Sequence, residues 1–274
     1  MIISKTDGRL ILVQQVDHAV LAADLASRWG NKEFTTPEPF ESVRLAAEKH
    51  DAGWVSPDRV PLFDAEAGKP LSFLEIDLRK HAAFYGAGVS EVESIDIYAA
   101  ILCSMHWTGL YRGRWGTAFG MLQKNLDDEK KAFLSNVVRE QEKRWIELKD
   151  RLWEPSDSRR LFENNIWINY ELLQAWDVLS LFICMQLDDG FDRSRVISPV
   201  PTGRGQDTVE LKVVLLAATN VFEFDPFPFS GEIEVSVEAR EIEDRIYAGL
   251  ADIQEALRDA PVRTINAVLV PANP

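Results

Sequence analysis

The chain is poor in cysteine and histidine, has no long apolar run and carries too few basic residues to balance its acidic ones. Only Cys103 and Cys184 are present among 274 residues, both inside apolar stretches, which argues against a disulfide framework or a thiolate zinc site. No apolar run approaches the roughly 20 residues that a spanning helix needs, and the first residues lack the pattern of a signal peptide. We therefore expect a cytoplasmic protein that does not bind membranes.

The charge balance restricts the partners further. Lys and Arg number 30 against 44 Asp and Glu, a net charge of −14. Such a surface repels the phosphate backbone of nucleic acids and anionic lipid, so neither is expected as a partner. The hydrophobic share of 46% and the charged share of 27% are typical of a globular protein. We expect a small-molecule substrate, and the composition leaves the oligomeric state open.

Hydrophobic periodicity predicts a mainly α protein with a smaller β-rich C-terminal part. Asp7-Gly8 predicts a hairpin within residues 1–15 that packs on the β-rich part. Helical patterns with a long proline-containing loop fill residues 16–192, and β-branched, partly alternating segments with one short helix fill residues 193–274. Helices are expected over 17–30, 36–50, 91–107, 127–153 and 157–188 and around Asp77, and the long loop over 55–75.

The four histidines fall on or beside predicted helices, together with two aspartates. In chain order these residues are His18, His50-Asp51, His81, His106 and Asp177. Their donors are nitrogen and oxygen, which suits one or two divalent ions such as Mn, Fe, Ni, Co or Zn. Asp177 lies in an otherwise apolar helix, where a charge needs a partner, either a metal ion or an arginine such as Arg44 or Arg79. Each histidine taken singly is more often a surface or core residue than a ligand.

Other residues near this set are candidates for substrate contacts. Tyr170 and Gln174 share a helix face with Asp177. Aromatic side chains form either a wall for a ring-bearing substrate or ordinary core, and cations near His81 and His106 are either phosphate contacts or solvated charges. The aromatic candidates are Trp54, Trp107 and Tyr111, and the cationic candidates are Arg79, Lys80, Arg112 and Arg114.

The order His, His-Asp, Asp resembles the signature of the HD-domain superfamily of metal-dependent phosphohydrolases, which have an all-helical core. The resemblance implies an HD-like core over residues 16–192, in which His18, His50, Asp51 and Asp177 hold one metal with Asp51 bridging, and His81 and His106 hold a second. The chain also resembles an uncharacterised bacterial family of unknown function along nearly its whole length. The segments that carry this second resemblance are EKHDAGW, the proline-rich loop, AILCSMHW, NYELLQAWDVLSL and DPFPF.

The HD resemblance implies a phosphoesterase, with a nucleotide as one candidate substrate and Asp51, His81 and His106 as catalytic residues. The sequence departs from the HD pattern at two positions, which weakens the inference of phosphoesterase activity. Trp54 stands where many dinuclear members have lysine, and Trp107 stands where they often have a second histidine. Two alternatives stay open. One is a di-iron oxygenase of the HD type, which uses the same ligands. The other is a binding or sensor module without turnover, which the acidic β-rich part favours.

Overall fold

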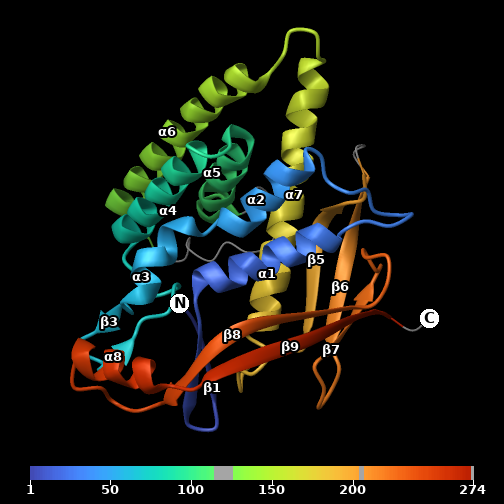
Figure 1. Cartoon of the computed structure of the whole chain (residues 1–274). Helices are drawn as coiled ribbons and strands as arrows, with labels where there is room; N and C mark the ends of the chain where they lie inside the picture. The colour runs from blue at the N-terminus through green and yellow to red at the C-terminus, as the bar shows by residue number, and fades with distance from the viewer. Residues whose placement is uncertain (114–125, 204–206, 273–274) are drawn as a thin grey trace.

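A computed structural model describes residues 1–113, 126–203 and 207–272, in which helices and one large sheet pack together (Figure 1). The helices are α1 (Gln15–Arg28), α2 (Phe40–Lys49), the 3-10 helix η1 (Ala52–Trp54), α3 (Val55–Arg59), α4 (Leu78–Glu93), α5 (Ile97–Tyr111), α6 (Asp128–Leu152), α7 (Arg159–Cys184) and α8 (Leu250–Asp259). The strands are β1 (Ile2–Thr6), β2 (Arg9–Val13), β3 (Phe63–Asp64), β4 (Lys69–Pro70), β5 (Ser194–Pro201), β6 (Thr208–Leu215), β7 (Val221–Asp225), β8 (Ile233–Glu243) and β9 (Val262–Pro271).

The expectation of a mainly α protein with a small β part is wrong. The chain is about 49% helical and 23% strand, and its curled seven-stranded sheet makes it a substantial α+β fold. The strand order is β1-β2-β8-β9-β7-β6-β5, with β7 and β9 parallel and the other pairs antiparallel. Pairing of β2 with β8 adds the N-terminal hairpin to the strands of the C-terminal third. The size of the sheet comes from this long-range pairing, which local periodicity does not report.

Helices and sheet share one hydrophobic core. A single cluster of buried side chains includes Ile11 of β2, Leu25 of α1, Leu173 of α7 and Leu269 of β9. In Figure 1, α1 and α7 lie against the sheet, and α4, α5 and α6 lie on the far side of these two helices. A smaller cluster joins α8 to the hairpin and the end of β8. The helices α1 and α7 therefore lie between the sheet and the remaining large helices.

The predicted helices are present, except that the range 91–107 covers the end of α4, a short break and most of α5. Local chemistry explains where the helices begin. Side chains of Asp77, Asp96, Asp127 and Ser158 cap α4, α5, α6 and α7 by accepting backbone N–H groups of the first turn. The second helix begins at Phe40 rather than 36 because Pro37 and Pro39 restrict the backbone before it. The expected loop over 55–75 contains α3 and the short pair β3 and β4. Among the described residues, no helix is both long and apolar enough to cross a bilayer.

Candidate metal centre

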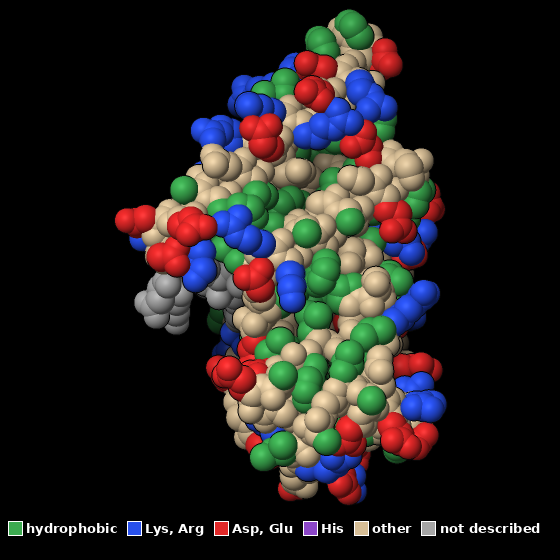
Figure 2. All heavy atoms as spheres, turned by 90° about the vertical axis from the view of Figure 1, so that its left-hand side faces the viewer, with side chains coloured by type: hydrophobic (Ala, Val, Ile, Leu, Met, Phe, Trp, Pro, Cys, Tyr) green, Lys and Arg blue, Asp and Glu red, His purple; other side chains and the backbone are tan. Residues whose placement is uncertain are grey.

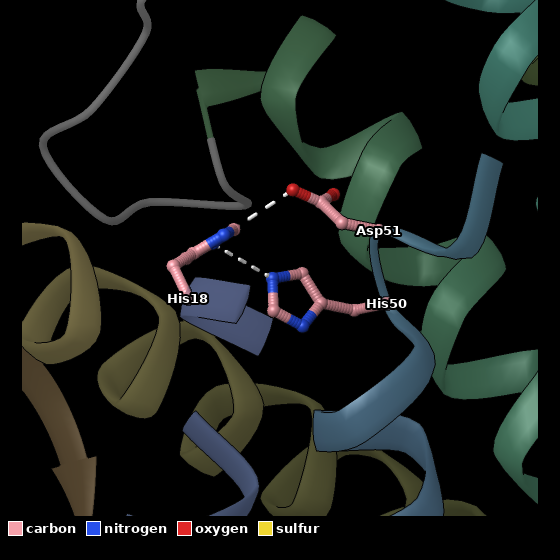
Figure 3. Close-up of side chains that lie close together, drawn as sticks. All are labelled: His18, His50 and Asp51. Carbon is pink, nitrogen blue, oxygen red and sulfur yellow. Dashed lines mark hydrogen bonds and ion pairs between the residues drawn. The ribbon is translucent and has the colours of Figure 1, made fainter. Parts of the chain in front are cut away.

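Four helices bring three histidines and two aspartates to one buried point. His18 comes from α1, His106 from α5 and Asp177 from α7. His50 caps the C-terminus of α2, and the backbone of Asp51 leaves the helical region (φ −110°, ψ 23°), so two neighbouring side chains reach the same cluster. All five side chains are about 2% exposed or less. Figure 3 shows contacts from His18 to both His50 and Asp51.

Three acceptor atoms of this cluster form a tight triangle. Nε2 of His18 lies 3.3 Å from Nε2 of His50 and 3.3 Å from Oδ1 of Asp177, and Nε2 of His50 lies 3.5 Å from the same oxygen. A tetrahedral ion with ligands at 2.0–2.1 Å separates those ligands by about 3.3–3.4 Å. The triangle therefore has the spacing of three ligands of one tetrahedral ion.

Backbone hydrogen bonds set the protonation of the two imidazoles. Nδ1 of His18 lies 2.5 Å from the carbonyl oxygen of Gln15, and Nδ1 of His50 lies 2.8 Å from that of Ala47. A carbonyl only accepts, so both Nδ1 atoms carry hydrogen and donate. If both rings are neutral, the lone pairs of the two Nε2 atoms point at each other. A metal ion or an added proton between the two nitrogens is then needed to relieve their repulsion. A hydrogen bond from the other ring nitrogen is also the usual support of a metal-binding histidine.

The charge around His50 favours a cation at this point. Burial by itself lowers the pKa of His50, but the charge of Asp51 and the hydrogen bond and charge of Asp177 outweigh it, so its pKa is raised. The same negative potential that favours a proton on His50 favours a divalent ion among these residues. The alternative partners considered for Asp177 are engaged elsewhere: Arg44 pairs with Glu41 and Glu48, and Arg79 with Glu129.

Asp51 is held by two donors that the sequence analysis missed. The hydroxyl of Tyr85 donates to Oδ1 at 2.7 Å, and the Gln15 amide donates to Oδ2 at 3.1 Å. Burial, followed by the charge of Asp51, raises the pKa of Tyr85 well above its usual range, so the phenol stays a donor. The sequence spacing could have indicated both donors. Gln15 precedes His18 by three positions and Tyr85 follows His81 by four, which places each pair on one helix face.

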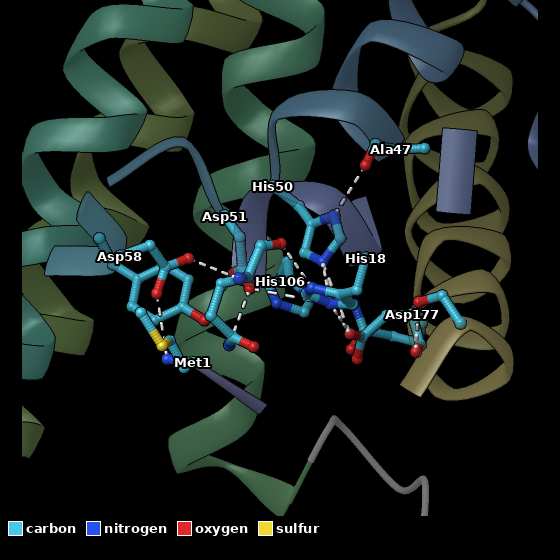
Figure 4. A network of polar contacts seen from close by, with 12 residues as sticks. Met1, His18, Ala47, His50, Asp51, Asp58, His106 and Asp177 are labelled. Carbon is cyan, nitrogen blue, oxygen red and sulfur yellow. Dashed lines mark hydrogen bonds and ion pairs between the residues drawn. The ribbon is translucent and has the colours of Figure 1, made fainter. Parts of the chain in front are cut away.

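The network continues beyond Gln15 to another buried carboxylate. The backbone nitrogen of Gln15 donates to Asp58 at 2.5 Å, and the backbone nitrogen of Met1 lies 3.1 Å from the same side chain. Burial raises the pKa of Asp58. Figure 4 shows Met1 and Asp58 at one end of this network and Asp177 at the other.

The ligand atoms fall into two groups that share a histidine. His18, His50 and Asp51 form one group, and His50, His106 and Asp177 form the other, with all ligand atoms of a group within 4.8 Å. Gln174 supports His106, with its amide nitrogen 3.2 Å from Nδ1. Within the described part of the chain, His81 belongs to neither group, and its Nδ1 lies 2.7 Å from the hydroxyl of Tyr111. The geometry thus groups His106 with His50 and Asp177, whereas the HD resemblance implies His81 as its partner.

A small cavity adjoins both groups. Its volume is about 20 Å³, enough for one water molecule. His18, Asp51, His81, His106 and Asp177 line it. Phe73 and the half-exposed Leu74 form its outer wall. His81 therefore faces the same space as the two groups without joining them.

The buried position of His81 predicts acid sensitivity. Burial lowers the pKa of His81 to about 4, against an ordinary 6.5 that the unfolded chain regains. The unfolded state then binds more protons as pH falls from 6.5 towards 4, so stability is lost over that window. We expect His81 to lower the free energy of unfolding by about 2 kcal/mol between pH 7.5 and pH 5. Urea unfolding of wild type and His81→Gln at both pH values measures this contribution. An equal loss of unfolding free energy in the two proteins would contradict it.

The structure places the predicted substrate contacts in two environments. Trp54, Trp107 and Tyr111 are buried around His81 and Tyr85, with the Trp107 ring stacked on Tyr85 at 5.9 Å. Tyr170 is buried against Trp167.

Three of the four predicted cations lie on the surface, namely Arg79, Lys80 and Arg112. Arg79 pairs with Glu129 and Arg112 with Glu142, and Lys80 is exposed. Arg114 lies outside the described residues. Figure 2 shows acidic and basic side chains interspersed on the face around α6, and no described histidine there.

Fold and site together define an α+β protein with a buried cluster of three histidines and two aspartates. Residues 1–244 match DUF3891, a protein family of unknown function, and the chain belongs to this family. This confirms the resemblance to an uncharacterised family. No curated protein and no solved structure matches the chain. The match includes every residue of the cluster and ends before β9, which lies between β8 and β7 in the sheet.

Proposed function

We propose that the protein is a metal-dependent phosphohydrolase that uses the buried cluster to hold a divalent ion. The observation that carries the proposal is the triangle of His18 Nε2, His50 Nε2 and Asp177 Oδ1, with edges of 3.3–3.5 Å. Asp51 and His106 add an oxygen and a nitrogen donor beside it. Phosphoester chemistry, with a nucleotide as one candidate substrate, rests on the HD-like order of these residues.

The protein's own residues would orient the reacting water. A divalent ion lowers the pKa of a bound water and stabilises the charge on phosphoryl oxygens. Tyr85 and Gln15 hold Asp51 in one orientation, and Gln174 holds His106. His81 faces the cavity as a neutral imidazole at pH 7, with one ring nitrogen left to exchange a proton with that water.

A second candidate is a metal-binding module without turnover. The observation that favours it is the cavity of about 20 Å³, which holds a water molecule but no organic substrate. For hydrolysis, the side chains of Phe73 and Leu74 must move to admit a phosphoester. A binding or sensing role needs no such movement.

Hydrolysis of bis(p-nitrophenyl) phosphate and p-nitrophenyl phosphate tests the proposal. We expect turnover with Mn²⁺, Co²⁺ or Ni²⁺ to fall at least about tenfold after chelation and to return when the metal is restored. Asp51→Asn should remain inactive, whereas Asp128→Asn, which changes a fully exposed carboxylate, should behave as wild type.

Each other outcome selects an alternative. Bound metal without turnover on these and on nucleotide phosphoesters would favour the binding module. Bound iron with an oxygen-dependent product would favour the di-iron oxygenase. Turnover that survives both chelation and Asp51→Asn would contradict a metal-dependent hydrolase at this site.

A further inference from the structure

A second pocket lies at the end of the polar network that is remote from Asp177. Its volume is about 510 Å³, within the range of small-molecule sites. It lies between α3, α8, β8 and the start of the chain, which Figure 1 shows close together. Asp58 lies in the wall of this pocket and connects through Gln15 to Asp51. The pocket is therefore separated from the buried histidine and aspartate cluster by one layer of side chains.

Three arginines from distant parts of the sequence line this pocket. Arg59 ends α3, Arg240 lies on β8 and Arg258 lies in the last turn of α8. Arg240 donates to the carbonyl oxygen of Ala260 at 2.9 Å. Among the described residues, no carboxylate lies within 4.0 Å of any of the three guanidinium groups. The one carboxylate that lines the pocket, Asp58, is held by Met1 and Gln15 instead.

These three arginines differ from several others of this acidic chain. Acidic residues outnumber basic ones by 44 to 30, and other arginines, such as Arg28, Arg144 and Arg245, pair with carboxylates. Guanidinium groups bind phosphate oxygens through paired N–H donors. The Gln14 and Gln254 amides add neutral donors, and Leu12 and Leu257 add an apolar wall for the organic part of a ligand.

We propose that the pocket between α3, α8 and β8 binds the phosphate group of a small organic phosphate. Arg59, Arg240 and Arg258 contact the phosphate oxygens, and the apolar wall contacts the remainder of the molecule. The site is separate from the metal cluster and does not depend on a bound metal.

Isothermal titration calorimetry with inorganic pyrophosphate in the presence of chelator tests this proposal. We expect the wild type to bind, and the double variant Arg59→Gln/Arg258→Gln to raise Kd at least about tenfold. Both side chains are exposed, so the variant should keep the wild-type circular dichroism spectrum. The matched control is Arg263→Gln, which changes an arginine that pairs with Glu241 and should leave Kd unchanged.

Four results would overturn the assignment. The first is no binding to wild type at millimolar pyrophosphate, and the second is wild-type affinity in the double variant. The third is equal affinity for citrate, which would show that the site does not select phosphate over carboxylate. Binding that requires added metal and disappears in Asp177→Asn would also overturn it, by placing the anion at the metal cluster in support of the proposed function.

Discussion

Replacement of His50 by alanine should reduce the metal content of protein purified without chelator to below about a tenth of the wild-type value. His50 is the one residue common to both ligand groups, and its Nε2 lies within 3.5 Å of both His18 Nε2 and Asp177 Oδ1. Its loss therefore leaves each group with two ligands. Metal analysis of protein reconstituted with Mn²⁺, Fe²⁺ or Zn²⁺ measures the effect.

The matched control is His81→Ala. This histidine is equally buried and lines the same cavity, but it belongs to neither group. We expect it to keep the wild-type metal content. Asp177→Asn is a near-isosteric second variant that should lose metal while keeping the fold. A wild type that takes up no metal after reconstitution would contradict the metal centre and leave a shared proton to bridge the two imidazoles.

Replacement of Gly53 by alanine should lower the free energy of unfolding by about 3 kcal/mol. A Cβ at this position would lie 1.9 Å from the carbonyl oxygen of Phe84, an atom of the α4 backbone that has no free rotation. Gly88 on α4 faces the same contact, since its Cβ would lie 2.6 Å from the nitrogen of Gly53. Because Gly53 follows Asp51 by two residues, the displacement should also reduce bound metal.

Gly86→Ala on the same helix is the control. A Cβ there meets no atom within 4 Å, so the change should stabilise the protein by about 0.5–1 kcal/mol through helix propensity. Urea unfolding followed by tryptophan fluorescence compares the two variants with wild type. Equal unfolding midpoints for Gly53→Ala and Gly86→Ala would show that the close approach of η1 and α4 is not required.

The candidate ligands could be predicted because each is exceptional in its local context. Only four histidines are present, and all of them are buried. Three of them line one cavity, and His50 contacts one of these three, His18. Asp177 is an acid in the buried helix α7, and His50-Asp51 stands where a different helix, α2, ends. Such residues violate the local pattern of burial, which is why functional sites can be found from sequence at all.

The supporting residues and the grouping could not be predicted in the same way. Gln15 and Tyr85 fit their helices without any local anomaly, and only packing shows that both donate to Asp51. The position of His106 beside His50 and Asp177 depends on how α5 crosses α2 and α7. Arg59, Arg240 and Arg258 are ordinary charges until three elements bring them to one pocket.

By itself the sequence determined the helices with their caps, the acidic charge and the polar residues that a metal requires, because periodicity and residue chemistry act locally. Only the tertiary structure decided that the N-terminal hairpin joins β8 and that β9 lies between β8 and β7. Strand pairing depends on partners more than 200 residues away for the hairpin, and no local pattern encodes that choice. The same long-range packing makes a substantial α+β protein from segments that individually indicate a mainly helical one.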